Sequence, residues 1–376
     1  MSVPGKSAWL ELHSGQLAGV LGAAAIAVLA MTVSNFLGAA IFHMEHSPVS
    51  PVMLAVVCGV VLGQIPVLAS GARSGACFAS THVLRLGIVL VGLKLSFAST
   101  LAIAGRALPI VAACLLVSSV VSIALARALG LRREFALLIA IGTSVCGCTA
   151  VMASSPLLRV RSEEVGYAIS CVVLIGLTGM LCYPWLAHAS FGSDPVAAGI
   201  LLGTSIHDTS QVVGAALLYS QTFAAPKALA AATVAKLLRN LTLVVLLPTL
   251  AVWDSHRFVD NDLSTYKRTA VRKSKFALIR SAIPGFVLLF ILMVVIRNAG
   301  DAAVTTHAIS GALWTRIGDI AARVSEYALT IGMAGVGLTL SVKDLPSLGL
   351  RPFAVAASAA LIVVSASWVL TSFLRP

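Results

Sequence analysis

Residues 203–214 read GTSIHDTSQVVG and lie in the middle of an otherwise apolar run, PVAAGILLGTSIHDTSQVVGAALLY (195–219). A second apolar run carries GTSVCGCTAVMA (142–153) at its centre, so both begin with Gly-Thr-Ser and an aliphatic residue. Charged side chains at the centre of a segment long enough to cross a membrane are costly and usually functional. What the two stretches do depends first on the kind of protein that contains them.

The composition is that of a polytopic membrane protein. Of 376 residues, 59% are hydrophobic and 11% charged, and the mean hydropathy is +0.99; soluble domains carry about 25% charged residues. We therefore predict an all-α fold with a single transmembrane transporter domain over 1–376. Eleven hydrophobic segments are expected, at 17–37, 52–69, 80–99, 107–129, 134–158, 163–189, 195–219, 226–252, 276–296, 325–343 and 351–374. The first is interpreted as a retained helix and not as a cleaved signal peptide.

The basic residues indicate topology. The net charge is +12, but Lys and Arg lie mostly between the hydrophobic runs, which favours a membrane orientation signal over nucleic-acid binding. The loop 253–275 is the most basic connection and is predicted to be cytoplasmic. Arginines also flank both ends of 134–158, so this segment either dips into the membrane and returns or is a broken helix that spans. If it dips, 195–219 must dip from the opposite face.

An internal repeat is also present. LGIVLVGLKLS (86–96) and IGMAGVGLTLS (331–341) match in register at a separation of 245 residues, and Arg106 corresponds to Arg351. The two copies lie in segments three and ten, which are an odd number of steps apart, so they are expected to run in opposite directions. This pattern predicts an inverted-repeat secondary transporter with candidate halves at 81–130 and 326–375.

The two Gly-Thr-Ser stretches predict two discontinuous helices, broken or re-entrant, that meet near the membrane midplane. Half-helix N-termini would suit an anion and carbonyl ends a cation; the alternative is that these small residues only pack helices together. The predicted substrate-binding residues in these stretches are Gly142, Thr143, Ser144, Cys146, Gly147, Gly203, Thr204, Ser205 and Gln211.

Asp208 is the one carboxylate deep in an apolar run, where a charge costs about 2.5 to 3.5 kcal/mol. His207 beside it can exchange a proton near neutral pH. We predict that Asp208, with His207, couples transport to H⁺ or Na⁺. A neutral, hydrogen-bonded structural pair is the alternative.

The segment 226–252 supplies two cations on one helical face. Lys236, Arg239 and Asn240 are three and four residues apart. They are assigned to substrate binding, either as an anion site or as the counter-charge of Asp208; snorkelling of Lys236 to the surface is the alternative.

The cysteines predict no disulfides and no metal site. Six of the seven lie within apolar segments, and the Cys146–Cys148 pair has no further ligands at zinc spacing. No cofactor is expected apart from a coupling H⁺ or Na⁺.

Taken together and in this order, GTSVCGCTA, GTSIHDTSQV and KLLRN resemble the conserved bacterial membrane proteins named as sulfate exporters. The likeness covers about residue 50 to the end. More distantly, segments three to six are similar to the bile-acid symporter half-repeat and to inverted-repeat transporters of the cation/proton antiporter type. The resemblance implies an inner-membrane, multi-pass transporter with a mobile core and a static panel, and sulfur anions as substrates. Because the second Gly-Thr-Ser segment precedes the repeat of segment three, sodium sites are not carried over.

We therefore expect an ion-coupled secondary transporter, and no enzyme, for sulfate, a related sulfur oxyanion or an organosulfonate, working by alternating access. The alternatives are a cation/proton antiporter centred on Asp208, an intramembrane thiol enzyme that uses Cys146 and Cys148, and a passive channel. The expected partners are the small anion and the lipid bilayer, without nucleic acid. The oligomeric state stays open, with a homodimer as one arrangement.

Overall fold

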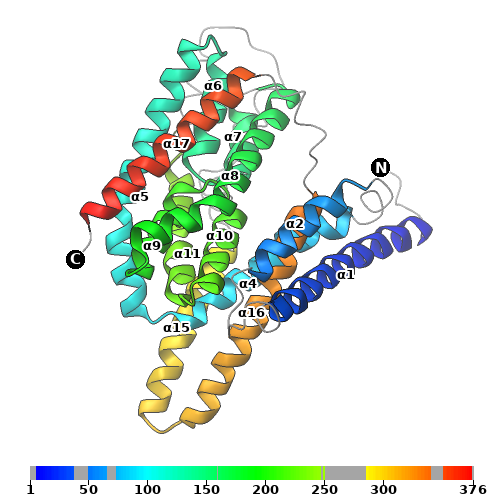
Figure 1. Ribbon diagram of the computed structural model, residues 1–376, viewed down its shortest axis with the longest axis vertical. Helices are drawn as coiled ribbons and strands as arrows, with labels where there is room; N and C mark the ends of the chain where they lie inside the picture. The colour runs from blue at the N-terminus through cyan, green and yellow to red at the C-terminus, as the bar shows by residue number, and fades with distance from the viewer. Residues whose placement is uncertain are drawn as a thin grey trace, which may run out of the picture.

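The computed structural model describes residues 6–37, 50–65, 73–158, 160–246, 249, 285–339 and 350–374, and all regular elements in these ranges are helices (Figure 1). The predicted all-α membrane class is confirmed. The basic loop 253–275 lies outside the described residues.

The helices, in chain order, are α1 (Lys6–Phe36), α2 (Pro51–Gly63), η2 (Ala79–Val83), α4 (Leu84–Val91), η3 (Gly92–Lys94), α5 (Phe97–Ala128), α6 (Arg133–Ser144), α7 (Cys148–Leu158), α8 (Ser162–Phe191), α9 (Pro195–Ser205), α10 (Thr209–Thr222), α11 (Pro226–Leu241), α15 (Gly285–Thr305), α16 (Gly311–Thr339) and α17 (Leu350–Phe373).

Within the described ranges, seven helices are long and apolar enough to cross a membrane, and the predicted number of eleven is not confirmed. The seven are Gln16–Phe36, Arg73–Lys94, Phe97–Ala128, Glu163–Phe191, Pro226–Leu246, Gly285–Thr305 and Arg351–Phe373. The segments 134–158 and 195–219 are each divided into two short helices. The described part of 325–343, residues 325–339, lies in α16, whose charged residues lower its hydropathy.

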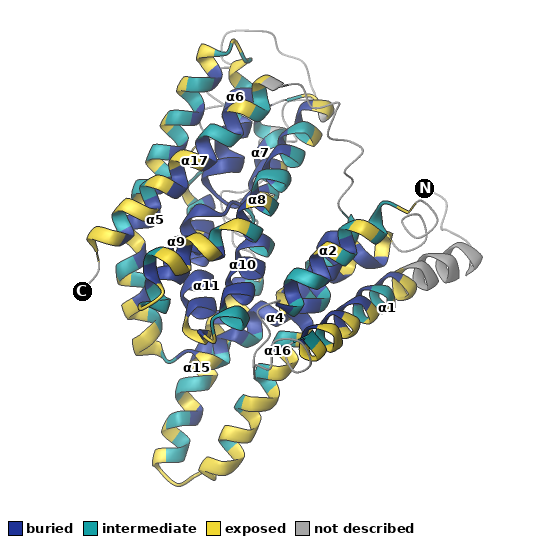
Figure 2. Cartoon of the chain, viewed as in Figure 1, coloured by how far each residue is buried: buried dark blue, intermediate teal, exposed yellow. Residues whose placement is uncertain are grey.

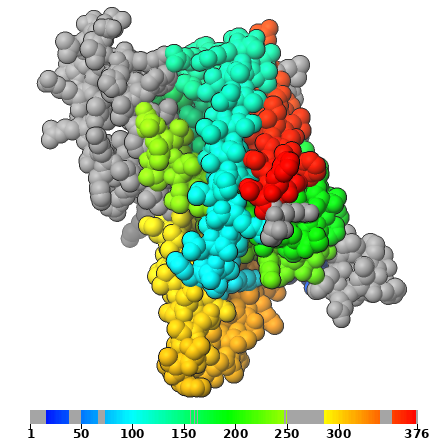
Figure 3. Space-filling view, turned by 90° about the vertical axis from the view of Figure 1, so that its left-hand side faces the viewer, coloured from blue at the N-terminus to red at the C-terminus, as the bar shows by residue number. Residues whose placement is uncertain are grey.

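The helices form two groups that lean against each other (Figure 1). The first, which we name the core bundle, contains α5 to α11 and α17; the second, the panel, contains α1, α2, α4, α15 and α16. Burial is deepest in α9, α10 and α11 at the centre of the core bundle (Figure 2). In the turned view, α5 and α17 cover the outer face of that bundle, and α15 and α16 project beyond it (Figure 3).

Close contacts between small residues bring the helices together. Gly199 and Gly203, one turn apart on α9, lie directly against α11, where a Cβ on Gly203 would come within 2.6 Å of the Ala232 carbonyl. Gly59 and Gly63 of α2 lie in the same way against the backbone of α16. Where no water is available, such close backbone packing is a main source of helix association.

Two helical hairpins lie inside the core bundle. In the first, α6 and α7 pack side by side, with Gly142 against Val151. In the second, α9 leads into α10, and the ring of Phe223 after α10 stacks on His188 at the end of α8 at 3.7 Å. The tip of each hairpin is one of the two Gly-Thr-Ser stretches.

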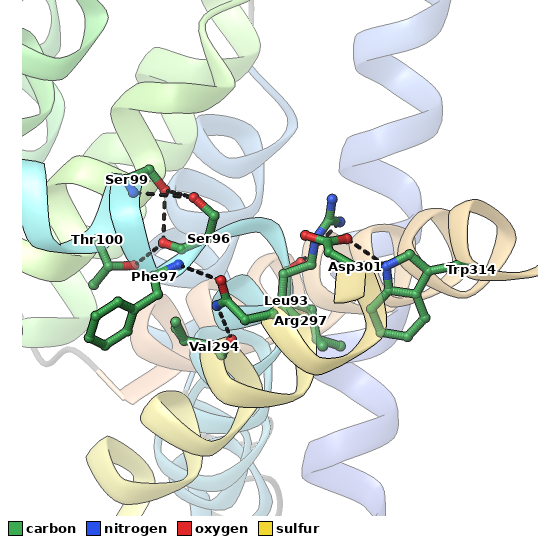
Figure 4. A network of polar contacts seen from close by, with 10 residues as sticks. Leu93, Ser96, Phe97, Ser99, Thr100, Val294, Arg297, Asp301 and Trp314 are labelled. Carbon is green, nitrogen blue, oxygen red and sulfur yellow. Dashed lines mark hydrogen bonds and ion pairs between the residues drawn. The ribbon is translucent and has the colours of Figure 1, made fainter. Parts of the chain in front are cut away.

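A polar network anchors the panel to the start of α5 (Figure 4). Asn298 of α15 accepts a hydrogen bond from the Phe97 backbone N–H at 3.0 Å. One turn away, Asp301 binds Arg297 at 2.9 Å and the indole N–H of Trp314 at 2.8 Å, which joins α15 to α16.

Asp194 fixes the start of the second hairpin. Its carboxylate accepts hydrogen bonds from the Val196 and Ala197 N–H groups and pairs with Arg106 of α5 at 3.0 Å. Burial alone would raise the pKa of this carboxyl, but the hydrogen bonds from Ala197 and Arg106 outweigh it and hold the pKa below its usual value.

We predict that Asp194→Ala lowers the free energy of unfolding by about 1 kcal/mol, the usual value for loss of a helix N-cap. A depressed carboxyl pKa stabilises the fold above the unfolded pKa, and this contribution is lost as the pH falls through the folded pKa. The difference between wild type and variant should therefore be constant at neutral pH and shrink in acid below about pH 4. Chemical unfolding at several pH values measures it, and a difference independent of pH would contradict the assignment.

Candidate functional site

Arg239 joins the tips of both hairpins. Its side chain is fully buried and donates hydrogen bonds to the carbonyls of Thr143 and Ser144 at 2.6 Å each and of Thr204 at 2.8 Å. A guanidinium presents five donors in a fixed plane, so one side chain can serve several carbonyls at once. These carbonyls are the ones left unpaired where α6 and α9 end.

Lys236, one turn earlier on α11, also joins the two hairpin tips. It binds the backbone carbonyls that follow, along the chain, those bound by Arg239. Its ammonium is fully buried and donates to the carbonyls of Val145 and Ile206 at 3.1 Å each, and to that of His207. Aligning the two Gly-Thr-Ser stretches makes Thr143 equivalent to Thr204 and Val145 equivalent to Ile206. Each cation therefore binds an equivalent pair of carbonyls, one from each hairpin.

This arrangement corrects the role predicted for the two cations. Both donors are directed at backbone carbonyls, neither residue lines the cavity described below, and no ion pair with Asp208 occurs among the described residues. Snorkelling is also wrong, because both side chains are fully buried. Two helix C-termini at the centre of the bundle need positive charge, and the cations supply it.

The hydroxyls of the Gly-Thr-Ser motifs also turn away from the cavity. Thr143 and Ser144 bond to three serines of α5, Ser118, Ser119 and Ser122. Thr204 bonds to Ser367 of α17 at 2.5 Å, and Ser205 bonds back to the Leu201 carbonyl.

The glycines of these motifs lie in helix contacts, Gly142 against Val151 and Gly203 against α11. The structure therefore places six residues predicted to bind substrate in packing positions: Gly142, Thr143, Ser144, Gly203, Thr204 and Ser205.

A cavity of about 590 Å³ lies between the hairpin tips and the panel. Four predicted site residues line it: Cys146, Asp208, Gln211 and Asn240. Further polar lining residues come from the two tips, Cys148, Thr149, Thr209 and Ser210, and from the panel side, Arg73, Ser80, Thr81 and Arg85; those from the panel side were not predicted as site residues. The only sequence signal for Arg85 was a basic residue inside an apolar run.

His207 does not line this cavity. Its ring is 1% exposed, and neither ring nitrogen has a hydrogen-bond partner among the described residues. The predicted proton exchange between His207 and Asp208 therefore has no contact that supports it.

Asp208 lies between the N-termini of two helices. As the N-cap of α10 it accepts a hydrogen bond from the Ser210 N–H at 2.9 Å. Its other carboxylate oxygen faces Gly147 at the start of α7, so close that a Cβ on Gly147 would lie 3.1 Å from it. Gly147 has no side chain with which to cap α7, and its φ of +66° favours glycine.

The charges around the tips do not cancel. A helix N-terminus carries about half a positive charge and a C-terminus about half a negative charge. The negative charge of Asp208 therefore balances the two N-termini. The two positive charges of Lys236 and Arg239 exceed the negative charge of the two C-termini by about one unit. Arg73 and Arg85 add two more on the opposite wall of the cavity. The charged residues that line the cavity itself are Arg73, Arg85 and Asp208.

We predict that Gly147→Ala destabilises the protein by about 1 to 2 kcal/mol, because a side chain is unfavourable in the left-handed region and would meet the Asp208 carboxylate. Gly105→Ala is the matched control. Gly105 lies inside α5 with open space around it, so alanine should stabilise the helix by about 0.5 to 1 kcal/mol. Thermal unfolding of both purified variants measures the difference, and equal effects would contradict the geometry of the tip.

Comparison with known proteins identifies the family. A family model described as Conserved hypothetical protein 698 matches residues 18–356. The chain is 30% identical to UPF0324 membrane protein PA5383 of Pseudomonas aeruginosa, over 84% of this chain and 83% of the relative. It is 30% identical to UPF0324 inner membrane protein YeiH of Salmonella typhi, over 85% and 84%, and 28% identical to UPF0324 membrane protein TauZ of Paracoccus denitrificans, over 82% and 83%. With seven helices able to span a bilayer among its described residues, the chain is an inner-membrane protein and belongs to the Conserved hypothetical protein 698 family.

Proposed function

We propose that this protein is an ion-coupled secondary transporter of a small anion that works by alternating access. The observation that carries the proposal is the arrangement of the hairpin tips. Both C-terminal ends are closed by buried cations, while the N-terminal ends of α7 and α10 border a polar cavity. Helix N-termini at membrane depth, next to irregular backbone, are typical of transporter substrate sites.

Reciprocal packing between α4 and α16 supports an inverted repeat. Gly87 lies against Leu329, and Gly332 lies against Leu84. In both the glycine pair and the leucine pair, the members are 245 residues apart, the separation of the sequence repeat. Equivalent residues that exchange places across a contact are the mark of an approximate two-fold axis.

The neighbouring helices extend this relation. Gly92 approaches the Phe290 carbonyl of α15, and its repeat mate Gly337 approaches the Val56 carbonyl of α2. α2 and α15 are thus counterparts. In the first copy, the hairpin α6–α7 follows α2 and α4 in the chain. In the second copy, the hairpin α9–α10 precedes α15 and α16. The second copy is therefore circularly permuted relative to the first.

The two hairpins are re-entrant and enter from opposite faces of the membrane. Arg132, before α6, pairs with Glu164 in the first turn of α8 at 3.5 Å, so the first hairpin enters where α8 begins. Phe223, after α10, stacks on His188 in the last turn of α8, so the second hairpin enters where α8 ends. The non-helical backbone at the two tips is tolerated at membrane depth because it is buried in protein and not exposed to lipid.

A second cavity, of about 400 Å³, lies at the opposite end of α10. Arg73 lines the first cavity and Lys94 the second, and these residues begin and end one membrane span. Between the cavities, α10 packs on the panel, with Gly214 against Met333. The first cavity lies toward the face with Arg127, Arg132 and Arg133, which the positive-inside rule makes cytoplasmic.

On the side of the second cavity, one glutamine closes the path between the core bundle and the panel. Gln221, in the last turn of α10, accepts a hydrogen bond from Ser50 before α2 at 2.7 Å and donates one to Glu326 of α16 at 2.7 Å. These bonds join the core bundle to the panel. In the alternating-access cycle they must break when the site opens to the other side.

Asp208 couples the substrate anion to a cation by charge. A proton or a cation at this carboxylate adds one positive charge to the cavity, which stabilises an anion about 5 Å away by about 3 kcal/mol at an effective dielectric constant of about 20. By linkage, the anion stabilises the cation to the same extent. The assignment of sulfate, a related sulfur oxyanion or an organosulfonate rests on the sequence resemblance.

A cation/proton antiporter is the second candidate. It is favoured by the observation that Asp208 faces the cavity while Lys236 and Arg239 are bound to carbonyls. Measuring which ion moves separates the two functions. A thiol enzyme that uses Cys146 and Cys148 would lose its activity on Cys→Ala substitution, whereas the transporter should retain flux.

We predict that purified protein in liposomes catalyses radiolabelled sulfate counterflow that competes with sulfite or thiosulfate and depends on a pH or sodium gradient. Asp208→Asn should bind the anion but lose the gradient dependence, because the neutral side chain can still cap α10. Glu163→Gln, at the surface end of α8, is the control. Flux with unchanged gradient dependence in Asp208→Asn would contradict the coupling role, and absence of anion flux in folded wild type would contradict the function.

We predict that Gln221→Leu shifts the protein toward the state open to the periplasm. In a variant whose only cysteine is Cys148, labelling by a membrane-impermeant maleimide added outside should become about tenfold faster, the effect of losing one or two hydrogen bonds. Gln64→Leu, outside both cavities, should leave the rate unchanged. An unchanged rate in Gln221→Leu would show that this contact does not close the path.

A further inference from the structure

The first cavity has one wall that offers acceptors and no cation. Gln211 is 1% exposed and Asn240 2% exposed, and both line the cavity. The Gln211 Oε1 and Asn240 Oδ1 atoms are buried without a hydrogen-bond partner among the described residues. Buried amide oxygens are normally paired, so two orphans in one cavity require an explanation.

The hydrogen bonds of Gln211 fix which of its amide atoms is free. The Gln211 nitrogen donates to the Val173 carbonyl at 2.8 Å, and because a carbonyl cannot donate, the oxygen must be the free atom. In the structure the Asn240 nitrogen donates to the Thr209 hydroxyl at 3.2 Å, which leaves the Asn240 oxygen without a partner. The free atom of each amide in this arrangement is an acceptor.

Asp208 belongs to the same wall. It is the N-cap of α10, three residues before Gln211, and Thr209 between them holds Asn240. One carboxylate and two amide oxygens thus come from adjoining positions of α10 and α11. A protonated Asp208 has a single O–H donor and can pair with at most one of the two amide oxygens, whereas a metal cation or an ammonium group can interact with both at once.

We propose that Asp208, Gln211 and Asn240 form a binding pocket for a monovalent cation, either sodium or the ammonium group of a zwitterionic substrate whose anionic group lies toward Arg73 and Arg85. The pocket rests on the proposed transport function and specifies its coupling site. Both sources share the same chemistry, a single positive charge held by oxygen ligands, and Asp208 supplies the compensating charge.

The first arm of the test uses sodium. Thermal unfolding of the purified full-length protein is followed as sodium chloride replaces N-methylglucamine chloride at constant ionic strength, with potassium chloride in parallel. A bound ligand raises the unfolding temperature in a saturable way. Saturable stabilisation by sodium identifies the metal ion as the occupant.

The second arm uses a matched pair of sulfonates, 2-aminoethanesulfonate and ethanesulfonate, which differ only in the amine. Stronger stabilisation by the amino compound, without a sodium effect, identifies the substrate ammonium. In either arm, Gln211→Met should weaken the apparent affinity by about tenfold or more, the usual effect of removing a hydrogen bond to a charge.

Gly176→Ala tests the pocket without altering a polar group. The Gln211 Oε1 atom occupies the space that Gly176 of α8 leaves, so an alanine there would displace it. Gly166→Ala on the same helix, with open space around it, is the control. Asn240→Asp should act in the opposite direction and tighten cation binding, because it adds negative charge while the Thr209 hydroxyl can still donate to it.

The pocket is overturned if neither sodium nor the amine stabilises folded wild type, or if Gln211→Met and Gly176→Ala leave an observed effect unchanged. Counterflow of radiolabelled sulfate and of radiolabelled 2-aminoethanesulfonate, measured on the same preparations, separates this result from failure of the proposed function. Flux without a stabilising effect of sodium or of the amine would contradict the cation pocket alone. Absence of flux would contradict the proposed transport function.

Discussion

Unpaired backbone carbonyls at the centre of an apolar protein are the constraint on which the rest of the structure depends. Two helices end there, α6 at Ser144 and α9 at Ser205, and water is not available to satisfy their last carbonyls. Lys236 and Arg239 of α11 supply the donors. Because each cation binds carbonyls of both hairpins, one helix fixes the position of both tips.

This solution makes the two sides of each tip chemically different. The carbonyl ends are closed by cations from the same chain, and the N–H ends lie beside the cavity with Asp208 between them. The cavity also lies where the core bundle meets the panel. The proposed alternating access therefore requires relative movement of these two groups of helices, which are drawn in Figure 1. Fixed tips and a movable boundary are the requirements of alternating access.

The sequence predicted much of this because a few residues are strongly out of place in an apolar run. Asp208, Gln211, Asn240 and Cys146 were predicted as site residues, and all four line the cavity. Residue spacing could not show whether a buried cation faces a ligand or a carbonyl, and for this reason Lys236 and Arg239 were misassigned.

Arg73 and Arg85 were not assigned because their role depends on the panel lying opposite the tips, which no local pattern records. Within the described residues the predicted number of spans was not confirmed. Hydropathy does not distinguish two short helices in succession, or the amphipathic α16, from one crossing helix. The contiguous motifs were sufficient to predict a conserved family of bacterial membrane proteins, whereas the likeness to sulfate exporters is not confirmed.

The most direct test of the central claim is the stability of Arg239→Met compared with Arg316→Met, an exposed arginine of α16. Loss of Arg239 leaves at least three buried carbonyls without their donor, and the account predicts a loss of more than about 3 kcal/mol in the free energy of unfolding, with little effect at Arg316. A folded Arg239→Met protein as stable as wild type would contradict the view that α11 holds the two hairpin tips together.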